Sequence, residues 1–188
     1  MNQVTNTPIR KLLALLLLGL VLPLAVAQGV LEGAEQTGVI AGVLDGAELQ
    51  WRTLAIDTEE GTQNTANYDV FMERFYSFTL QGHQGTSLIE GTLSISFTSL
   101  GGPLTDCPCD ITGEIMYWTT TSMFNDVYMA EDAVITVLEF EELSDGAVRL
   151  TGTATAQLYF HESATSDGPS GDPVALTLDF TIDRVGLE

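Results

Sequence analysis

The stretch VRLTGTATAQLYF, residues 148–160, decides the fold class of this chain. Apolar residues and one glycine occupy its even-numbered positions, and mainly polar residues occupy the odd-numbered ones. Such alternation places one set of side chains in a core and the other in water, as in a half-buried antiparallel strand. The same period of two recurs in residues 92–98 and 174–183.

Weaker alternation and turn signals extend this pattern along the chain. Asp45-Gly46 and Asp145-Gly146 predict hairpin turns, because aspartate and glycine tolerate the positive φ that such turns need. The spacing predicts an all-β fold, an antiparallel β-sandwich of about eight strands, with a small closed antiparallel barrel as the alternative. The remaining predicted strands are 38–44, 48–56, 69–80, 111–121 and 133–141; polar loops are expected at 57–68 and 161–173, and a short helix at 122–132.

The first 27 residues have the three parts of a secretory signal peptide. Arg10 and Lys11 precede an apolar run at 12–22, and the small residues before Gln28 form a cleavage site. The run is shorter than the roughly 20 residues of a membrane-spanning helix, so we expect cleavage near Ala27-Gln28 and a secreted or periplasmic protein. Residues 28–37 are expected to be a flexible leader and residues 38–188 a single β domain without a transmembrane segment.

The charge of the chain restricts its partners. All 26 acidic residues, but only four of the six basic ones, follow residue 27, and the formal net charge of the whole chain is −20. Such a surface repels phosphate backbones and anionic lipids, so nucleic acid is excluded as a partner. The acidic residues are spread along the chain, which indicates solubility more than cation binding.

The two cysteines lie in TDCPCD, residues 105–110. In an exported protein, Cys107 and Cys109 are expected to form a disulfide that staples the turn around Pro108. As alternatives, the pair could bind copper or zinc, or exchange disulfides.

Other metal or catalytic signals are weak. His83 and His161 are interpreted as solvated loop residues, and HESAT, residues 161–165, lacks the second histidine of a zinc-protease motif. Asp167 and Asp172 are weak candidates for a Ca²⁺ loop, because their spacing is not that of an EF-hand. Without a nucleophile motif or a distinctive pair of carboxylates, the sequence predicts no enzyme and no required cofactor.

Aromatic and hydroxyl side chains offer the best binding hypothesis. Exposed rings on a sheet can stack on sugars or on side chains of a partner, although strands also favour such residues in the core. Tyr117 and Trp118 are neighbours, so one should be buried and the other exposed. Hydroxyl columns at 92–98, 151–155 and 177–181 could tile one solvent face. The candidate ligand-surface residues are Trp51, Tyr117, Trp118 and Tyr159.

The sequence therefore predicts an exported, acidic, non-catalytic binding or structural module whose partner is a surface, a glycan or a protein. Two alternatives stay open. One is a metal-handling or thiol-redox protein that uses the Cys107-Pro108-Cys109 loop, and the other is a small hydrolase with paired carboxylates.

Overall fold

The computed structural model describes residues 31–72, 74–100, 104, 106–163 and 168–187 of the chain. Within these residues the fold is almost entirely antiparallel β-sheet, which confirms the all-β prediction. The expected signal peptide lies outside the described residues. A short 3₁₀ turn, η1 (Leu31–Gly33), comes first. The ten strands are β1 (Glu35–Leu44), β2 (Ala47–Thr58), β3 (Gly61–Asn64), β4 (Ala66–Phe71), β5 (Phe75–His83), β6 (Thr92–Leu100), β7 (Cys109–Trp118), β8 (Asn125–Glu142), β9 (Val148–Ser163) and β10 (Ser170–Leu187).

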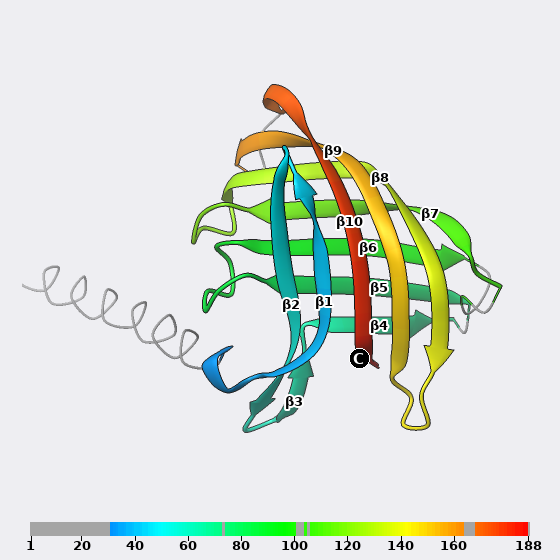
Figure 1. Cartoon of the computed structure of the whole chain (residues 1–188). Coiled ribbons are helices and arrows are strands. Elements are labelled where there is room, and N and C mark those ends of the chain that lie inside the picture. The colour runs from blue at the N-terminus through cyan, green and yellow to red at the C-terminus, as the bar shows by residue number, and fades with distance from the viewer. Residues whose placement is uncertain (1–30, 73, 101–103, 105, 164–167, 188) are drawn as a thin grey trace, which may run out of the picture.

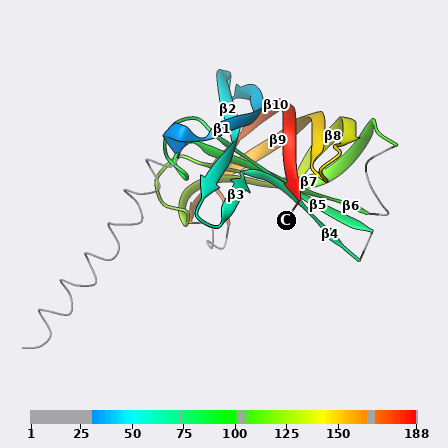
Figure 2. The same ribbon diagram turned by 90° about the horizontal axis from the view of Figure 1, so that it is seen from below.

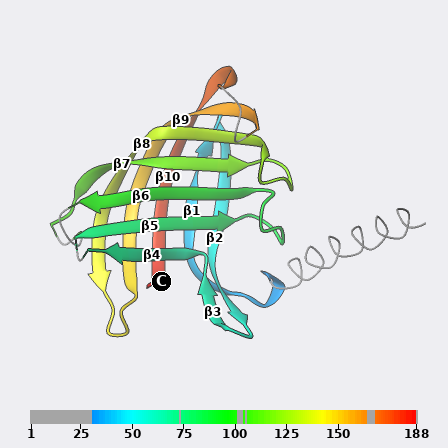
Figure 3. The same ribbon diagram turned by 180° about the vertical axis from the view of Figure 1, so that it is seen from behind.

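The strands form two layers that cross each other. In Figure 1, β1, β2, β10 and long parts of β8 and β9 run down the front layer, and β4, β5, β6 and β7 cross behind them. Figure 3 shows the second layer from its own side. The strand order is β3-β2-β1-β10-β4-β5-β6-β7-β8-β9, and β10 also pairs with β9, so hydrogen-bonded neighbours continue around the domain. The pairing of β10 with β4 is parallel and covers only two residues of each strand.

The two layers enclose one main core, to which β8 contributes by bending. The pairing of β8 with β9 shifts its register between Met129 and Val134, where β8 turns from one layer toward the other (Figure 1). Such irregularities increase local twist and let one strand serve both layers. The inward side chains of both layers fill the interior; among the largest that are fully buried are Trp51, Phe78, Phe180, Ile40, Leu80 and Ile135.

The turn chemistry agrees with the sequence prediction. Asp45 and Gly46 have φ values of 49° and 79°, and they join β1 to β2 between the paired residues Leu44 and Ala47. Two consecutive residues at positive φ form the hairpin turn that matches strand twist. Gly146, at φ 84°, likewise lies in the connection between β8 and β9.

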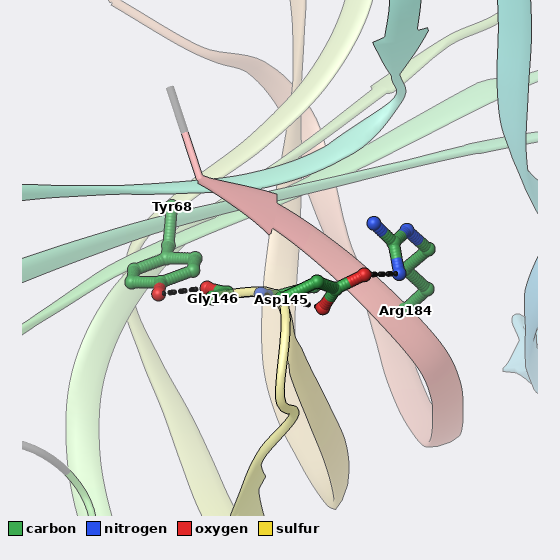
Figure 4. A network of polar contacts seen from close by, with 5 residues as sticks. Tyr68, Asp145, Gly146 and Arg184 are labelled. Atoms are coloured by element: carbon green, nitrogen blue, oxygen red, sulfur yellow. Dashed lines mark hydrogen bonds and ion pairs between the residues drawn. The ribbon is translucent and has the colours of Figure 1, made fainter.

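Polar contacts anchor this second turn to two other strands (Figure 4). The Tyr68 hydroxyl on β4 donates a hydrogen bond to the carbonyl oxygen of Gly146, at 2.6 Å. The Arg184 guanidinium on β10 donates to Oδ2 of Asp145, also at 2.6 Å. That hydrogen bond is the main reason why the pKa of Asp145 is lowered, and burial is the main reason why the pKa of Tyr68 is raised. The turn therefore joins β4 and β10 close to their short parallel pairing.

Three local predictions need correction. Strand β1 begins at Glu35, and Leu31 is buried against Leu54 and Ile56, so the expected leader at 28–37 is partly ordered into the domain. The predicted loop at 57–68 contains β3 and the start of β4. Strand β3 escaped prediction because it is a short edge strand whose first three residues are exposed, so it has no buried face to produce alternation.

The predicted helix at 122–132 is wrong, because β8 begins at Asn125 and runs through this segment. Val127 and Ala130 are buried, but the register shift of β8 interrupts the period of two that would identify a strand. No helix in the described part of the chain is long and apolar enough to cross a membrane.

Candidate functional site

Trp51 is not a surface residue, which corrects the first of the four aromatic predictions. Its side chain is fully buried in the core, with its ring edge-on to Tyr117 at a centroid distance of 6.0 Å. Gly82 makes room for it, because a Cβ atom there would lie 2.6 Å from Cβ of Trp51. Trp51 is buried because of tertiary packing: β2 crosses β5 at this point, where Arg52 pairs with His83.

Tyr117 and Trp118 are both half-buried, so the two side chains differ less in burial than predicted. Tyr117 lies opposite Leu93 and faces the core, and burial raises the pKa of its hydroxyl. Trp118 follows it on β7 and therefore faces the other side, where its indole N–H donates to the carbonyl oxygen of Met123 at 3.2 Å. Neither ring offers a fully open face to a ligand.

Tyr159 remains the best candidate for ligand contact. Its side chain is 38% exposed on β9 and lines a hollow of about 420 Å³. His161 lines the same hollow from a half-buried position on β9, which corrects its interpretation as a solvated loop residue. The walls of the hollow are Met129, Ala130, Glu131, Asp132, Tyr159, His161 and Pro169.

The hollow lies at one end of a column of hydroxyl side chains. Strand β9 points Thr151, Thr153 and Thr155 to the same side as Tyr159, because side chains two residues apart share a face. The pairing of β9 with β10 sets Thr155 opposite Thr177, and Thr151 opposite Thr181. We call nine of the outward side chains of these two strands the threonine face; they are Thr151, Thr153, Thr155, Gln157, Tyr159, Ala175, Thr177, Asp179 and Thr181. The exposed charged residues Arg149 and Asp183 lie just beyond it, with Nε of Arg149 3.9 Å from Oδ1 of Asp183.

The threonine face continues onto the neighbouring strands with mainly small and apolar residues, although the exposed Glu139 of β8 lies opposite Thr151. Val134 of β8 lies opposite Thr155, and Val43 of β1 lies opposite Thr177. On β1, Ala41 lies opposite Asp179 and Val39 lies opposite Thr181. Neighbouring strands are about 4.8 Å apart and residues on one face repeat about every 6.7 Å, so methyl and hydroxyl groups form a regular grid. In a chain with 26 acidic residues, Asp179 is the sole carboxylate among the nine residues of this face.

The hydroxyl column on β6 contributes less to the surface than predicted, since only Thr98 of its four hydroxyl residues is exposed. Thr92 and Ser94 are buried. The Thr92 hydroxyl donates to the carbonyl oxygen of Leu88 and lies 3.0 Å from Nδ1 of His83, so the segment that precedes β6 is tied to its outer face. Alternation alone could not indicate that both faces of β6 are covered at this end.

The two cysteines are bonded to each other, as the sequence predicted for a stapled turn. Cys109 begins β7, whereas His83 pairs with Thr92 at the other end of β6. A nine-residue strand spans roughly 26 Å, so His83 lies far from the disulfide. Across the described residues, no group of three His, Cys, Asp or Glu side chains is placed to hold a metal ion. Asp172 is exposed near the start of β10, and Asp167 lies outside the described residues.

His83 is buried, which corrects its interpretation as a solvated turn residue. In the described part of the chain, its Nε2 atom has no hydrogen-bond partner. Burial lowers the pKa of His83 and the nearby Arg52 guanidinium acts in the same direction, while the backbone of Ser87 opposes both. The imidazole is therefore neutral in the folded protein near neutral pH.

This buried imidazole predicts a loss of stability on mild acidification. The pKa of His83 is lower in the folded than in the unfolded chain, so below the unfolded value of about 6.5 the unfolded chain binds more protons. The contribution of the neutral His83 side chain to the free energy of unfolding is fully present above about pH 6.5. This contribution is lost as the pH falls toward the lowered pKa of His83 in the folded chain. Between pH 7.5 and pH 5.5 we expect a loss on the order of 1 kcal/mol at most in the free energy of unfolding.

Urea titrations at both pH values would measure this loss, with His83→Gln as the matched variant, because glutamine can still hydrogen-bond Thr92 but does not titrate. The variant should lose less stability than the wild type over this range. Equal losses in the two proteins would show that His83 is not the group responsible.

Comparisons with protein-family models, with curated proteins and with solved structures find no match to this chain. Its functional interpretation therefore depends on the surface described above.

Proposed function

We propose that the protein is a non-catalytic binding module that holds a neutral glycan along the threonine face, with Tyr159 as the stacking residue. The observation that carries this proposal is the register of β9 and β10, which aligns threonines across the strands beside an exposed ring. Hydroxyl and amide side chains both donate and accept hydrogen bonds, as the hydroxyl groups of sugars require. A tyrosine ring adds a flat apolar surface on which a sugar ring can stack. Fixing the ring on binding costs little conformational entropy, because the side chain has few rotatable bonds.

The charge of the chain favours an uncharged glycan. With a net charge of −20, the protein repels anionic polymers at long range. Of the nine residues of the threonine face, Asp179 alone is charged, so a neutral sugar chain would contact mainly uncharged side chains there. Glu139 beside Thr151, and Glu131 and Asp132 in the hollow, would have to stay hydrated when the chain binds. In the exported location that residues 1–27 predict, neutral polysaccharides are accessible partners.

The curvature of the face favours a flexible chain over a crystalline lattice. Strands β8, β9 and β10 coil visibly in Figure 1, as twisted sheets do. A rigid lattice would contact only part of such a surface, whereas a polysaccharide chain can follow one column of threonines into the hollow at Tyr159.

Affinity electrophoresis tests the proposal directly. Native gels that contain a panel of neutral polysaccharides should retard the purified protein, and gels that contain an anionic polysaccharide should not. Tyr159→Ala should weaken binding roughly tenfold or more, since loss of a buried tyrosine contact typically costs about 2 kcal/mol at a binding hot spot. Thr155→Val, which keeps the shape of the side chain but removes its hydroxyl, should weaken binding less.

Phe124→Ala is the matched control, because Phe124 is an exposed aromatic residue outside the threonine face. This variant should bind as the wild type does. The proposal fails if no neutral glycan retards the protein, or if the Tyr159 and Phe124 variants are retarded equally.

A further inference from the structure

A second hollow lies where β4 replaces β1 as the neighbour of β10. Strand β1 follows β10 as far as Ile182, and β4 pairs with β10 from Gly186 onward. Strand β3 and the end of β10 lie at the same end of the domain (Figures 1 and 2), and the hollow between them has a volume of about 520 Å³. This volume is typical of ligand pockets. We call the hollow the wedge; its walls are Thr62, Gln63, Asn64, Asn67, Gly186 and Leu187.

The wedge lies along the outer edge of β3. Successive side chains of a strand point to opposite faces, so a hollow that touches all three residues 62–64 lies beside the edge of the strand. Among the strands of the described residues, β3 pairs with β2 alone. The edge of β3 that borders the wedge therefore has no strand partner in this part of the chain.

The register of β3 identifies the backbone groups on this edge. Thr58 and Gly61 pair across the two-residue turn between β2 and β3. The pair that flanks such a turn exchanges backbone hydrogen bonds, and every second pair after it does the same. The N–H and C=O groups of Thr62 and Asn64 lie in the intervening pairs, so they point away from β2. Strand β3 thus presents two main-chain donors and two main-chain acceptors to the wedge.

Thr65 fixes the closed end of the wedge, between β3 and β4. Its N–H donates to the carbonyl oxygen of Leu54, and its own carbonyl oxygen accepts from the N–H of Gln81, both at 2.8 Å. Its hydroxyl accepts from the N–H of Leu54 and donates to the carbonyl oxygen of Gln81, again at 2.8 Å. Because Thr65 is bonded to β2 on one side and to β5 on the other, binding in the wedge does not have to order this segment first.

Asn64 packs closely against β10. A Cβ atom at Gly186 would lie 2.4 Å from Nδ2 of Asn64, so the amide lies directly on the glycine backbone. Within the described residues, Oδ1 of Asn64 is buried and has no hydrogen-bond partner. An unsatisfied buried acceptor is destabilising, and a ligand N–H that reaches this amide would remove the penalty. The site therefore favours a ligand that carries N–H groups.

The shape of the wedge favours a single extended chain. Strand β3 bounds it on one side and the β4–β10 pair on the other, so the edge of a second folded domain would be blocked by β4 and β10. An extended peptide is one chain wide, and its N–H and C=O groups repeat at the two-residue spacing of Thr62 and Asn64. None of the residues that line the wedge is aromatic, so a sugar ring would find no stacking surface there.

The charges near the wedge favour a basic peptide. None of the six lining residues is charged. The only arginine of β10, Arg184, is paired with Asp145. The net charge of −20 attracts cationic chains at long range. Exposed acidic residues lie close to the wedge in the β2–β3 hairpin and on β4; they are Asp57, Glu59, Glu60 and Asp69.

We propose that the wedge binds an extended, basic segment of a partner protein, which adds as a strand to the free edge of β3. Main-chain hydrogen bonds to Thr62 and Asn64 would hold the segment, and its lysine or arginine side chains would lie beside the acidic hairpin. Because only two residues of β3 contribute, we expect weak and reversible binding. This inference does not depend on glycan binding, since it uses other strands and other residues.

Fluorescence anisotropy with a labelled peptide tests the inference. The probe is Lys-Thr-Val-Thr-Val-Thr-Val-Lys, which favours an extended chain and carries a positive charge at each end. It should bind the wild-type protein, and Thr62→Pro should weaken binding at least tenfold, because proline removes an N–H and its ring obstructs the edge. N-methylation of all the central residues of the probe should abolish binding.

Two variants control for other effects of the proline. Thr62→Val keeps the N–H but loses the hydroxyl hydrogen bond to Asp57, and it should bind as the wild type does. Gln50→Pro places a proline at an exposed position of β2 whose N–H points away from β1, three pairs beyond the pair that closes the β1–β2 turn. It should also bind normally. None of these changes alters the charge, so nonspecific attraction of the basic probe cancels.

Nuclear magnetic resonance keeps the test decisive if Thr62→Pro does not fold. In the wild type, the probe should slow hydrogen exchange at the N–H groups of Thr62 and Asn64, because both would become hydrogen-bonded. Replacing both lysines of the probe with glutamate should weaken binding at least threefold, and added salt should reduce that difference.

The inference is overturned if the probe does not bind the wild type at millimolar concentration, or if Thr62→Pro and Gln50→Pro bind it equally. It is also overturned if Thr62→Pro abolishes a dimer of the wild type while no peptide binds, since β3 would then pair with a second copy. Protection of Thr62 and Asn64 by neutral sugars, and not by the probe, would make the wedge a glycan site instead.

Discussion

Replacing Trp51 with alanine is expected to destabilise the fold by about 3 kcal/mol, near the lower end of the range for deleting a buried aromatic side chain. Trp51 is fully buried between the layers, where its ring meets the edge of Tyr117 and its Cβ abuts Gly82. Alanine would leave a cavity that these neighbours cannot fill without moving β2. The loss is at the lower end because the indole Nε1 is already buried without a partner in the described structure, and removing it relieves that cost.

Urea unfolding followed by circular dichroism would measure this effect, with Trp118→Ala as the control. Trp118 is half-buried and faces the other side of β7, so its removal should cost about 1 kcal/mol or less, as for an ordinary surface residue with one hydrogen bond. In the Trp118 variant, Trp51 is the single remaining tryptophan, and its fluorescence should be that of a ring shielded from water. Equal destabilisation by the two changes would contradict the crossing of β2 over β5.

Replacing Gly152 with alanine is expected to cost about 2–3 kcal/mol, although the change adds only a methyl group. A Cβ atom at this position would lie 2.4 Å from Cζ of Phe180 and 2.4 Å from the carbonyl oxygen of Thr136. The phenyl ring could shift within the core, but the carbonyl belongs to the backbone of β8. Moving it would disturb the pairing of β8 with β9 beside Val137, which lies opposite Gly152.

Gly85→Ala provides the control for this prediction. A Cβ atom at Gly85 would meet no atom within 4 Å, and the residue does not have a positive φ. Its change in unfolding free energy should stay within about 0.5 kcal/mol. The same urea titrations would serve both variants. If Gly152→Ala proves as mild as Gly85→Ala, then β9 does not run where the structure places it.

The sequence indicated the strands whose two faces have different environments. Residues 148–160 alternate because β9 is covered on one side and faces solvent on the other. Strand β10 alternates for the same reason from Leu176 to Ile182. Where this condition fails, so does the prediction: β3 is exposed on both sides, and β6 is buried on both sides where it begins.

The candidate site was predictable in its parts but not in its arrangement. Tyr159 and the threonine columns stand out because polar residues recur at every second position. No local sequence pattern indicates that Thr155 lies opposite Thr177, since that depends on the register between β9 and β10. The burial of Trp51 and His83 was missed for a related reason. Both depend on β2 crossing β5, which brings together residues about thirty positions apart.

The position of β10 determines when the sheet of this protein can be completed. The last strand lies between the first strand and β9, and it also meets β4, so three parts of the sheet find their partner only in residues 170–187. Contacts between segments so distant in sequence form late and slowly. A chain emerging from the ribosome therefore has no complete sheet until residues 170–187 have emerged. Until residues 170–187 are available, β1, β4 and β9 each have a sheet edge without the partner that they have in the folded protein.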